Sequence, residues 1–148
     1  MRGAPGGAGS RADGSRGAAL STVAVVEDNA DNRLLVRAIL GDAYDVREFA
    51  SGDEALAAFA RAVPDLVLLD ISLPGLSGLE VIARLRADAR LARVPVVALT
   101  AHAMDGDRRR YLAAGFDGYV AKPILHETIL LDAIARALAG GGAGRPPR

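Results

Sequence analysis

Short apolar segments alternate along the chain with segments whose apolar residues recur at helical spacing. The short segments are rich in β-branched residues, which favours strands. They span residues 22–26, 44–49, 66–69, 94–99 and 116–120. The segments with helical spacing span residues 31–40, 53–62, 79–88, 105–114 and 127–138. The pattern therefore predicts five strands, each followed by a helix.

Several helix ends carry capping signals that support these boundaries. Ser51-Gly52-Asp53-Glu54 and Ser77-Gly78-Leu79-Glu80 both have the serine and glutamate spacing of a capping box at a helix start. Gly41 and Gly115 stand where the first and fourth helices are expected to stop, as glycine commonly does.

Two of the predicted strands, 66–69 and 94–99, are almost continuously apolar. Such runs are typical of parallel strands that are covered on both faces, and Pro95 is tolerable at a strand entry. Right-handed crossovers then place helices on both sides of the sheet. We expect an α/β fold, a (βα)₅ doubly wound, five-stranded parallel sheet, whose ligand site lies at the carboxyl ends of the strands.

Polar residues follow four of the five predicted strands. Glu27 and Asp28 follow the first, Asp70 the third, Thr100 the fourth and Lys122 the fifth. Each alone could be an ordinary turn or loop residue, but together they predict three carboxylates, one hydroxyl and one ammonium at one edge. Three carboxylates repel one another unless a cation binds, and Mg²⁺ prefers such oxygen ligands.

Composition limits the remaining possibilities. The chain has 148 residues, of which 51% are hydrophobic, so it is long enough for one domain with a core. Ten of its 17 glycines lie in residues 1–20 and 139–148, which we expect to be disordered tails around a domain at 21–138. The absence of cysteine excludes disulfides and thiolate chemistry.

Charge and hydropathy bear on partners and location. Residues 21–138 carry 13 basic and 17 acidic side chains, which does not favour nucleic-acid binding. No apolar run approaches the ~18–20 residues of a membrane span, and no signal peptide is evident. We expect a cytoplasmic protein with neither nucleic acid nor membrane as partner.

Lys122 is the single lysine in a chain with 17 arginines. A compact ammonium at a strand end is suited to contact a phosphoryl oxygen. The chain has no P-loop motif, and Glu27-Asp28-Asn29 occupies the first strand–helix turn, where a dinucleotide fingerprint would need glycines. A zincin motif and a G-x-S-x-G elbow are also absent.

Four segments together resemble the receiver domains of two-component response regulators, the CheY-like domains. They are VAVVEDN at 23–29, PDLVLLDISLPGLSGLE at 64–80, PVVALTAHA at 95–103 and GFDGYVAKP at 115–123. The resemblance extends over residues 22–138 and implies the flavodoxin-like strand order 2-1-3-4-5.

The resemblance also implies roles for individual residues. Asp70 matches the phosphoacceptor, which takes a phosphoryl group from phosphohistidine. Asp28 matches a direct Mg²⁺ ligand and Glu27 a ligand through water, while the carbonyl of Ser72 would be a further ligand.

Three more residues match the phosphoryl-binding and switch positions of the family. Thr100 would close on the phosphoryl group, Lys122 would balance its charge, and Tyr119 would change its burial together with Thr100. Tyr119 could also be an ordinary strand aromatic. We further expect the Lys122–Pro123 peptide bond to be cis, which would direct the lysine towards Asp70.

The implied function is a phosphorelay switch rather than an enzyme. A histidine kinase or histidine phosphotransfer protein would donate the phosphoryl group, and an output protein would bind the face formed by the fourth helix, fifth strand and fifth helix. Met1 and the tails are typical of a complete single-domain protein, with a receiver fragment of a hybrid kinase as an alternative. A metal-dependent aspartyl-phosphate phosphatase is less favoured, because Ser72 replaces the acid/base aspartate that such enzymes carry two residues after the nucleophile.

Overall fold

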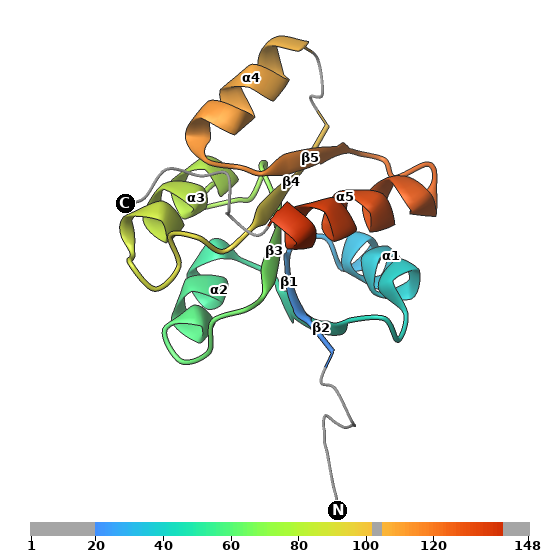
Figure 1. Cartoon of the computed structure of the whole chain (residues 1–148), viewed down its shortest axis with the longest axis horizontal. Helices are drawn as coiled ribbons and strands as arrows, with labels where there is room; N and C mark the ends of the chain where they lie inside the picture. Colours follow the sequence, from blue (N-terminus) through green and yellow to red (C-terminus); the bar gives the residue numbers. More distant parts are fainter. Residues whose placement is uncertain (1–19, 102–104, 141–148) are drawn as a thin grey trace, which may run out of the picture.

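Five parallel strands form one sheet in the computed structural model, which describes residues 20–101 and 105–140 (Figure 1). The strands are β1 (Thr22–Val26), β2 (Asp45–Phe49), β3 (Leu66–Asp70), β4 (Val96–Thr100) and β5 (Gly118–Ala121). Their order is β2-β1-β3-β4-β5, and every neighbouring pair is parallel. The predicted fold and strand order are confirmed.

Helices cover both faces of this sheet. They are α1 (Ala30–Leu40), α2 (Gly52–Phe59), α3 (Gly78–Ala87), α4 (Asp105–Ala114) and α5 (Glu127–Gly140). Helices α1 and α5 lie on one side, and α2 and α3 on the other, with α4 beyond α3 next to β5 (Figure 1).

The pleat of the strands divides the core into two clusters. Alternate strand residues such as Val26, Leu69 and Ala98 pack beneath α2, α3 and α4. The residues between them, such as Leu68 and Leu99, pack beneath α1 and α5. Strands buried on both faces must be apolar along their whole length, which explains the continuous runs in the sequence.

The predicted caps are largely confirmed. At α3, the Ser77 hydroxyl accepts from the Glu80 N–H, and the Glu80 carboxylate accepts from the Ser77 N–H. At α2, Ser51 accepts from the Glu54 N–H, and its hydroxyl donates to the Glu54 carboxylate. Gly41 and Gly115 follow α1 and α4 with φ of 55° and 112°, which glycine adopts without strain.

Some element boundaries differ from the prediction by one to three residues. Strand β4 begins at Val96 rather than at 94, and β3 and β4 extend to include Asp70 and Thr100. Helix α2 ends at Phe59, whereas α5 continues to Gly140, inside the predicted tail. Of the predicted tails, residues 1–19 and 141–148 lie outside the described residues. Within the described residues, no helix is both long and apolar enough to cross a membrane.

The Arg86 side chain at the end of α3 joins the loop before β4 to the loop before β5. It is 7% exposed, and its guanidinium donates to the carbonyls of Val94 at 2.7 Å and Gly115 at 2.8 Å. It also pairs with Asp117 at 3.2 Å, and the same Asp117 oxygen accepts from the N–H of Val96 at 2.8 Å. Arg86 therefore fixes the start of β4 relative to the loop that leads into β5.

Candidate functional site

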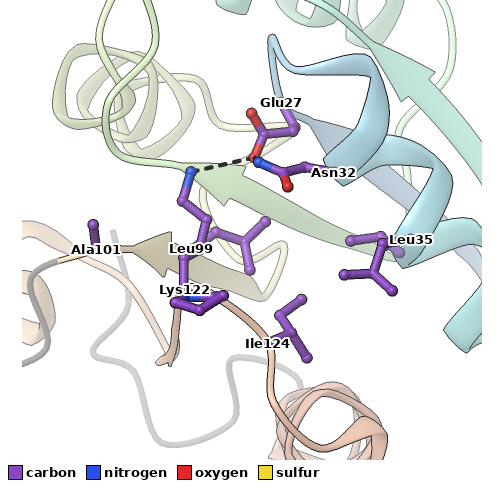
Figure 2. Close-up of a pocket in the computed structure, with 9 residues that line it drawn as sticks. Glu27, Asn32, Leu35, Leu99, Ala101, Lys122 and Ile124 are labelled. Carbon is purple, nitrogen blue, oxygen red and sulfur yellow. Dashed lines mark hydrogen bonds and ion pairs between the residues drawn. The ribbon is translucent and has the colours of Figure 1, made fainter.

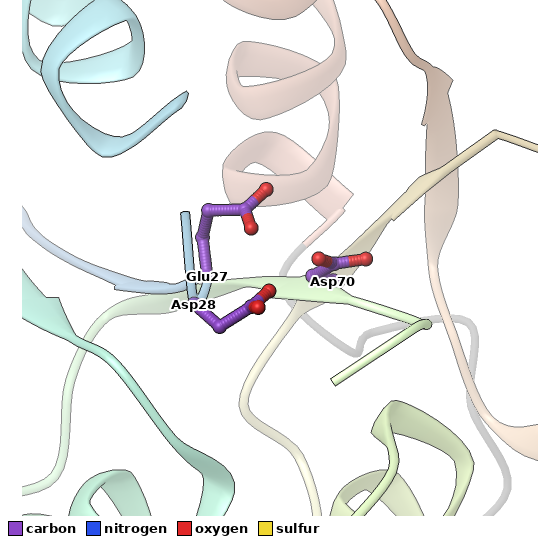
Figure 3. Close-up of side chains that lie close together, drawn as sticks. All are labelled: Glu27, Asp28 and Asp70. Carbon is purple, nitrogen blue, oxygen red and sulfur yellow. The ribbon is translucent and has the colours of Figure 1, made fainter. Parts of the chain in front are cut away.

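Three carboxylates converge at the carboxyl end of the sheet (Figure 3). Glu27 and Asp28 follow β1, Asp70 ends β3, and one oxygen of each lies within 4.8 Å of the others. Glu27 and Asp70 are buried, with exposures of 1% and 2%, whereas Asp28 is exposed. The predicted acidic cluster is thus present, with one carboxylate open to solvent.

The site residues divide between the two faces of the sheet by strand alternation. Glu27, Asp70 and Lys122 continue the positions that pack beneath α1 and α5. Thr100 continues the positions that pack beneath α2, α3 and α4, and Tyr119 packs against that cluster. Glu27, Asp70 and Lys122 therefore share one side, and the two predicted switch residues share the other.

Glu27 is held by donors from the loop and from α1. Its carboxylate accepts from the Asn29 N–H at 3.0 Å and from the Asn32 amide at 3.2 Å. The guanidinium of Arg33 donates to the main-chain carbonyls of Glu27 at 2.7 Å and Asp28 at 3.2 Å. Burial raises the pKa of Glu27, and the negative charge of Asp70 adds to this, although the Asn29 N–H opposes it.

The Asp70 carboxylate accepts from the Lys122 ammonium at 3.1 Å and from the Ser72 N–H at 2.9 Å. The backbone behind it is closely packed. A Cβ at Gly78 would lie 2.4 Å from the Asp70 carbonyl oxygen, so only glycine fits where α3 begins. The main chain at Asp70 therefore lies directly against the start of α3.

Lys122 bridges the two buried carboxylates, since its Nζ also lies 3.3 Å from Glu27 Oε1 (Figure 2). Partial burial alone would lower the pKa of Lys122, but the hydrogen bond and charge of Asp70, together with those of Glu27, raise it. The peptide bond to Pro123 is cis, as predicted. Beside the lysine, Leu35, Leu99 and Ile124 help to line a cavity of about 260 Å³.

The hydroxyl of Thr100 lies 2.8 Å from the hydroxyl of Tyr111, and both residues are buried. The Tyr111 ring lies 6.4 Å from that of Tyr119, which is half-buried, and makes an edge contact with Phe116 at 6.0 Å. Sequence reasoning did not identify Tyr111. The available signal is that it is the one aromatic residue in the polar helix DGDRRRYLAA.

Sequence reasoning also missed Asn32 and Arg33, which hold the acidic loop. The predicted residues Glu27, Asp28, Asp70 and Lys122 are brought together, and the Ser72 N–H joins them. Thr100 ends the neighbouring strand β4, and Tyr119 lies within β5, opposite Ala98. Three clustered carboxylates, of which that of Asp28 is exposed, supply the oxygen ligands that suit a hard divalent cation such as Mg²⁺.

Known proteins share both sequence and fold with this chain. The family model described as "Response regulator receiver domain" matches residues 23–135. The polar-differentiation response regulator DivK of Brucella ovis is 43% identical over 104 residues, which cover 70% of this chain and 85% of DivK.

Two solved structures illustrate the structural similarity. One is the receiver domain of sensor histidine kinase PA1611 from Pseudomonas aeruginosa, described with a magnesium ion coordinated in its active-site cleft. It is 35% identical, with a TM-score of 0.74, and the match covers 82% of this chain and 99% of that one. The other is the chemotaxis protein CheY4 of Vibrio cholerae, at 29% identity, a TM-score of 0.74, and coverage of 80% and 99%. With a family match across most of its length and the same fold, this chain belongs to the response regulator receiver domain family and takes part in two-component signalling.

Proposed function

We propose that Asp70 accepts a phosphoryl group from a phosphohistidine of a histidine kinase or histidine phosphotransfer protein, and that this modification switches the protein's interactions. The observation that carries the proposal is the position of the Asp70 carboxylate. It lies 3.1 Å from the Lys122 ammonium and beside two further carboxylates. A nucleophile, a cation and a metal-binding group are the parts that phosphoryl transfer requires.

The transfer exchanges one bond to phosphorus for another. A carboxylate oxygen of Asp70 forms a P–O bond while the P–N bond of phosphohistidine breaks, and the electron pair of that bond remains on the imidazole nitrogen. Lys122 lies where its ammonium can balance the added negative charge. The N–H of Ser72, which contacts Asp70, holds the carboxylate in place.

Asp28 and Asp70 would hold Mg²⁺ directly, with Glu27 contributing through water and Ser72 through its carbonyl. The exposed Asp28 carboxylate suits direct binding, while both oxygens of Glu27 already accept hydrogen bonds from this chain. When bound, Mg²⁺ neutralises charge on the phosphoryl oxygens.

A switch describes the chain better than an enzyme that turns over substrate. Position 72 carries an exposed serine, which cannot act as the general acid of an aspartyl-phosphate phosphatase. The curated relatives at 43% identity are response regulators, which also favours this reading over a fragment of a hybrid kinase. An output protein bound at the α4–β5–α5 face, and a cytoplasmic location, stay predictions.

Incubation with acetyl phosphate and Mg²⁺ tests this proposal. We expect each chain to gain one phosphoryl group, because an Asp70 oxygen can displace acetate from phosphorus. Intact mass gives the stoichiometry, and hydroxylamine should remove the group, since it cleaves acyl phosphates. A modification that maps to another residue, or no modification with either acetyl phosphate or a phosphorylated histidine phosphotransfer protein, would overturn the proposal.

Asp28→Ala is expected to weaken Mg²⁺ binding at least about tenfold, because it removes a direct ligand. The fold should persist, since the side chain is exposed and its loss reduces repulsion within the cluster. Isothermal titration with Mg²⁺ and thermal melting measure the two effects, with the exposed Asp42→Ala as control. Unchanged Mg²⁺ affinity would contradict the role of Asp28 as a ligand.

A further inference from the structure

Tyr111 is a fully buried tyrosine that the proposed phosphoryl chemistry does not use. Its exposure is 0%, although most of α4 around it is polar. Its hydroxyl lies 2.8 Å from that of Thr100, so the two form a buried hydrogen bond between α4 and the end of β4. A buried hydroxyl that loses its hydrogen-bond partner destabilises the state in which it is buried.

The surroundings fix the Tyr111 side chain in this position. Its ring packs in the cluster beneath α2, α3 and α4, with edge contact to Phe116 and a tilted contact to Tyr119. Its main-chain carbonyl accepts from the Phe116 N–H at 3.1 Å. The phenol is therefore a rigid partner, and Thr100 is the side chain that would have to move.

Strand alternation places Thr100 on the α4 side and the Asp70 carboxylate on the opposite side. If the Thr100 hydroxyl turned towards a phosphoryl group on Asp70, it would lose its hydrogen bond to the Tyr111 hydroxyl. Loss of this buried hydrogen bond is unfavourable in free energy, so a new hydrogen bond from Thr100 to the phosphoryl group must compensate for it.

We infer that Tyr111 is a positioning residue, which holds the Thr100 hydroxyl against α4 and opposes its closure on a phosphoryl group at Asp70. The inference rests on the proposed function. It implies that the Thr100 hydroxyl breaks its hydrogen bond to Tyr111 of α4 when it turns towards the phosphoryl group. Phosphorylation would then affect α4 through this hydrogen bond as well as through the predicted switch residue Tyr119.

Tyr111→Phe removes one oxygen and keeps the ring. We expect it to bind beryllofluoride, a mimic of the phosphoryl group, roughly two- to tenfold more tightly in the presence of Mg²⁺, because the open state loses the hydrogen bond that stabilises it. Titration followed by amide NMR measures the affinity. The control is Tyr44→Phe, which removes the hydroxyl of a half-buried tyrosine outside the site and should leave the affinity unchanged.

A double-mutant cycle with Thr100→Val separates positioning from a general effect on packing. In the Thr100→Val background, Tyr111→Phe should no longer alter beryllofluoride affinity, because the partner hydroxyl is already absent. In the unmodified protein, the amide signals of Thr100 and Tyr111 should both shift on binding, a result that does not depend on how the variants fold.

Three results would overturn the inference: unchanged or weaker binding by Tyr111→Phe, the same gain in the Thr100→Val background, or no shift at Tyr111 in the unmodified protein. If the unmodified protein itself shows no Mg²⁺-dependent binding of beryllofluoride, and acetyl phosphate does not modify it, the proposed function fails instead.

Discussion

Replacing Asp70 with asparagine is expected to abolish phosphoryl uptake from acetyl phosphate and from phosphohistidine. An amide has no anionic oxygen to attack phosphorus, and the change also removes one of the two negative partners of the Lys122 ammonium. Asparagine keeps the size of the side chain and an oxygen that can accept from the Ser72 N–H. Intact mass after incubation with donor and Mg²⁺ measures the result.

The same variant should fold, which makes the loss of phosphorylation interpretable. Asp70 is one of the groups that raise the pKa of Glu27, so its neutralisation should lower that pKa and remove repulsion between two buried carboxylates. The exposed Asp42→Asn should accept phosphoryl groups normally. Equal modification of Asp70→Asn and the unmodified protein would show that Asp70 is not the acceptor.

Arg86→Met is expected to lower the free energy of unfolding by about 3–5 kcal/mol. The change leaves the carbonyls of Val94 and Gly115 and the Asp117 carboxylate without the guanidinium that binds them. The main-chain carbonyls that lose their donor carry most of this cost, because the Asp117 carboxylate is partly exposed and keeps the Val96 N–H. Urea or thermal unfolding measures it.

Two further variants distinguish the loss of the buried Arg86 contacts from the mere loss of a positive charge on α3. Arg84 is exposed on the same helix, so Arg84→Met should alter the unfolding free energy by no more than about 0.5 kcal/mol. Arg86→Lys should recover only part of the stability, because one ammonium cannot reach all the acceptors that the planar guanidinium contacts at the same time. If all three variants have the same stability, the buried contacts of Arg86 contribute little.

The sequence predicted the alternation of strands and helices because the central strands β3 and β4 are buried along their whole length and the helices carry apolar residues at helical spacing. Those constraints produce a regular spacing of apolar residues along the chain. The strand order was implied by the resemblance to receiver domains.

The boundaries of strands were not predictable where a side chain distant in the sequence determines them. Strand β4 begins at Val96, since Pro95 has no N–H and Asp117 accepts from the Val96 N–H.

The candidate site was predictable where its residues immediately follow or end strands, because parallel strands bring their carboxyl ends to one edge. Glu27, Asp70 and Lys122 are of this kind, and the fold brings them into contact. Contacts made from within helices were not predictable. Arg33 and Tyr111 lie in the interior of α1 and α4, and nothing in the spacing indicates which strand end they meet.

Arg86 was missed for a different reason. Arginine is rarely buried, so an arginine within a helix is normally assigned to the solvent-facing side. Its neighbours in space, Gly115 and Asp117, lie 29 and 31 residues later in the chain. Only the packing of the α3–β4 and α4–β5 loops reveals the buried guanidinium.

The bridge between Lys122, Glu27 and Asp70 has a practical consequence, because the chain contains no other lysine. Incorporation of isotope-labelled lysine would place a single spectroscopic probe in the whole molecule, and that probe would lie beside the phosphoacceptor. Its signal would need no assignment and would have no overlap. The state of the site could therefore be followed in crude mixtures, with kinase and partner proteins present in unlabelled form.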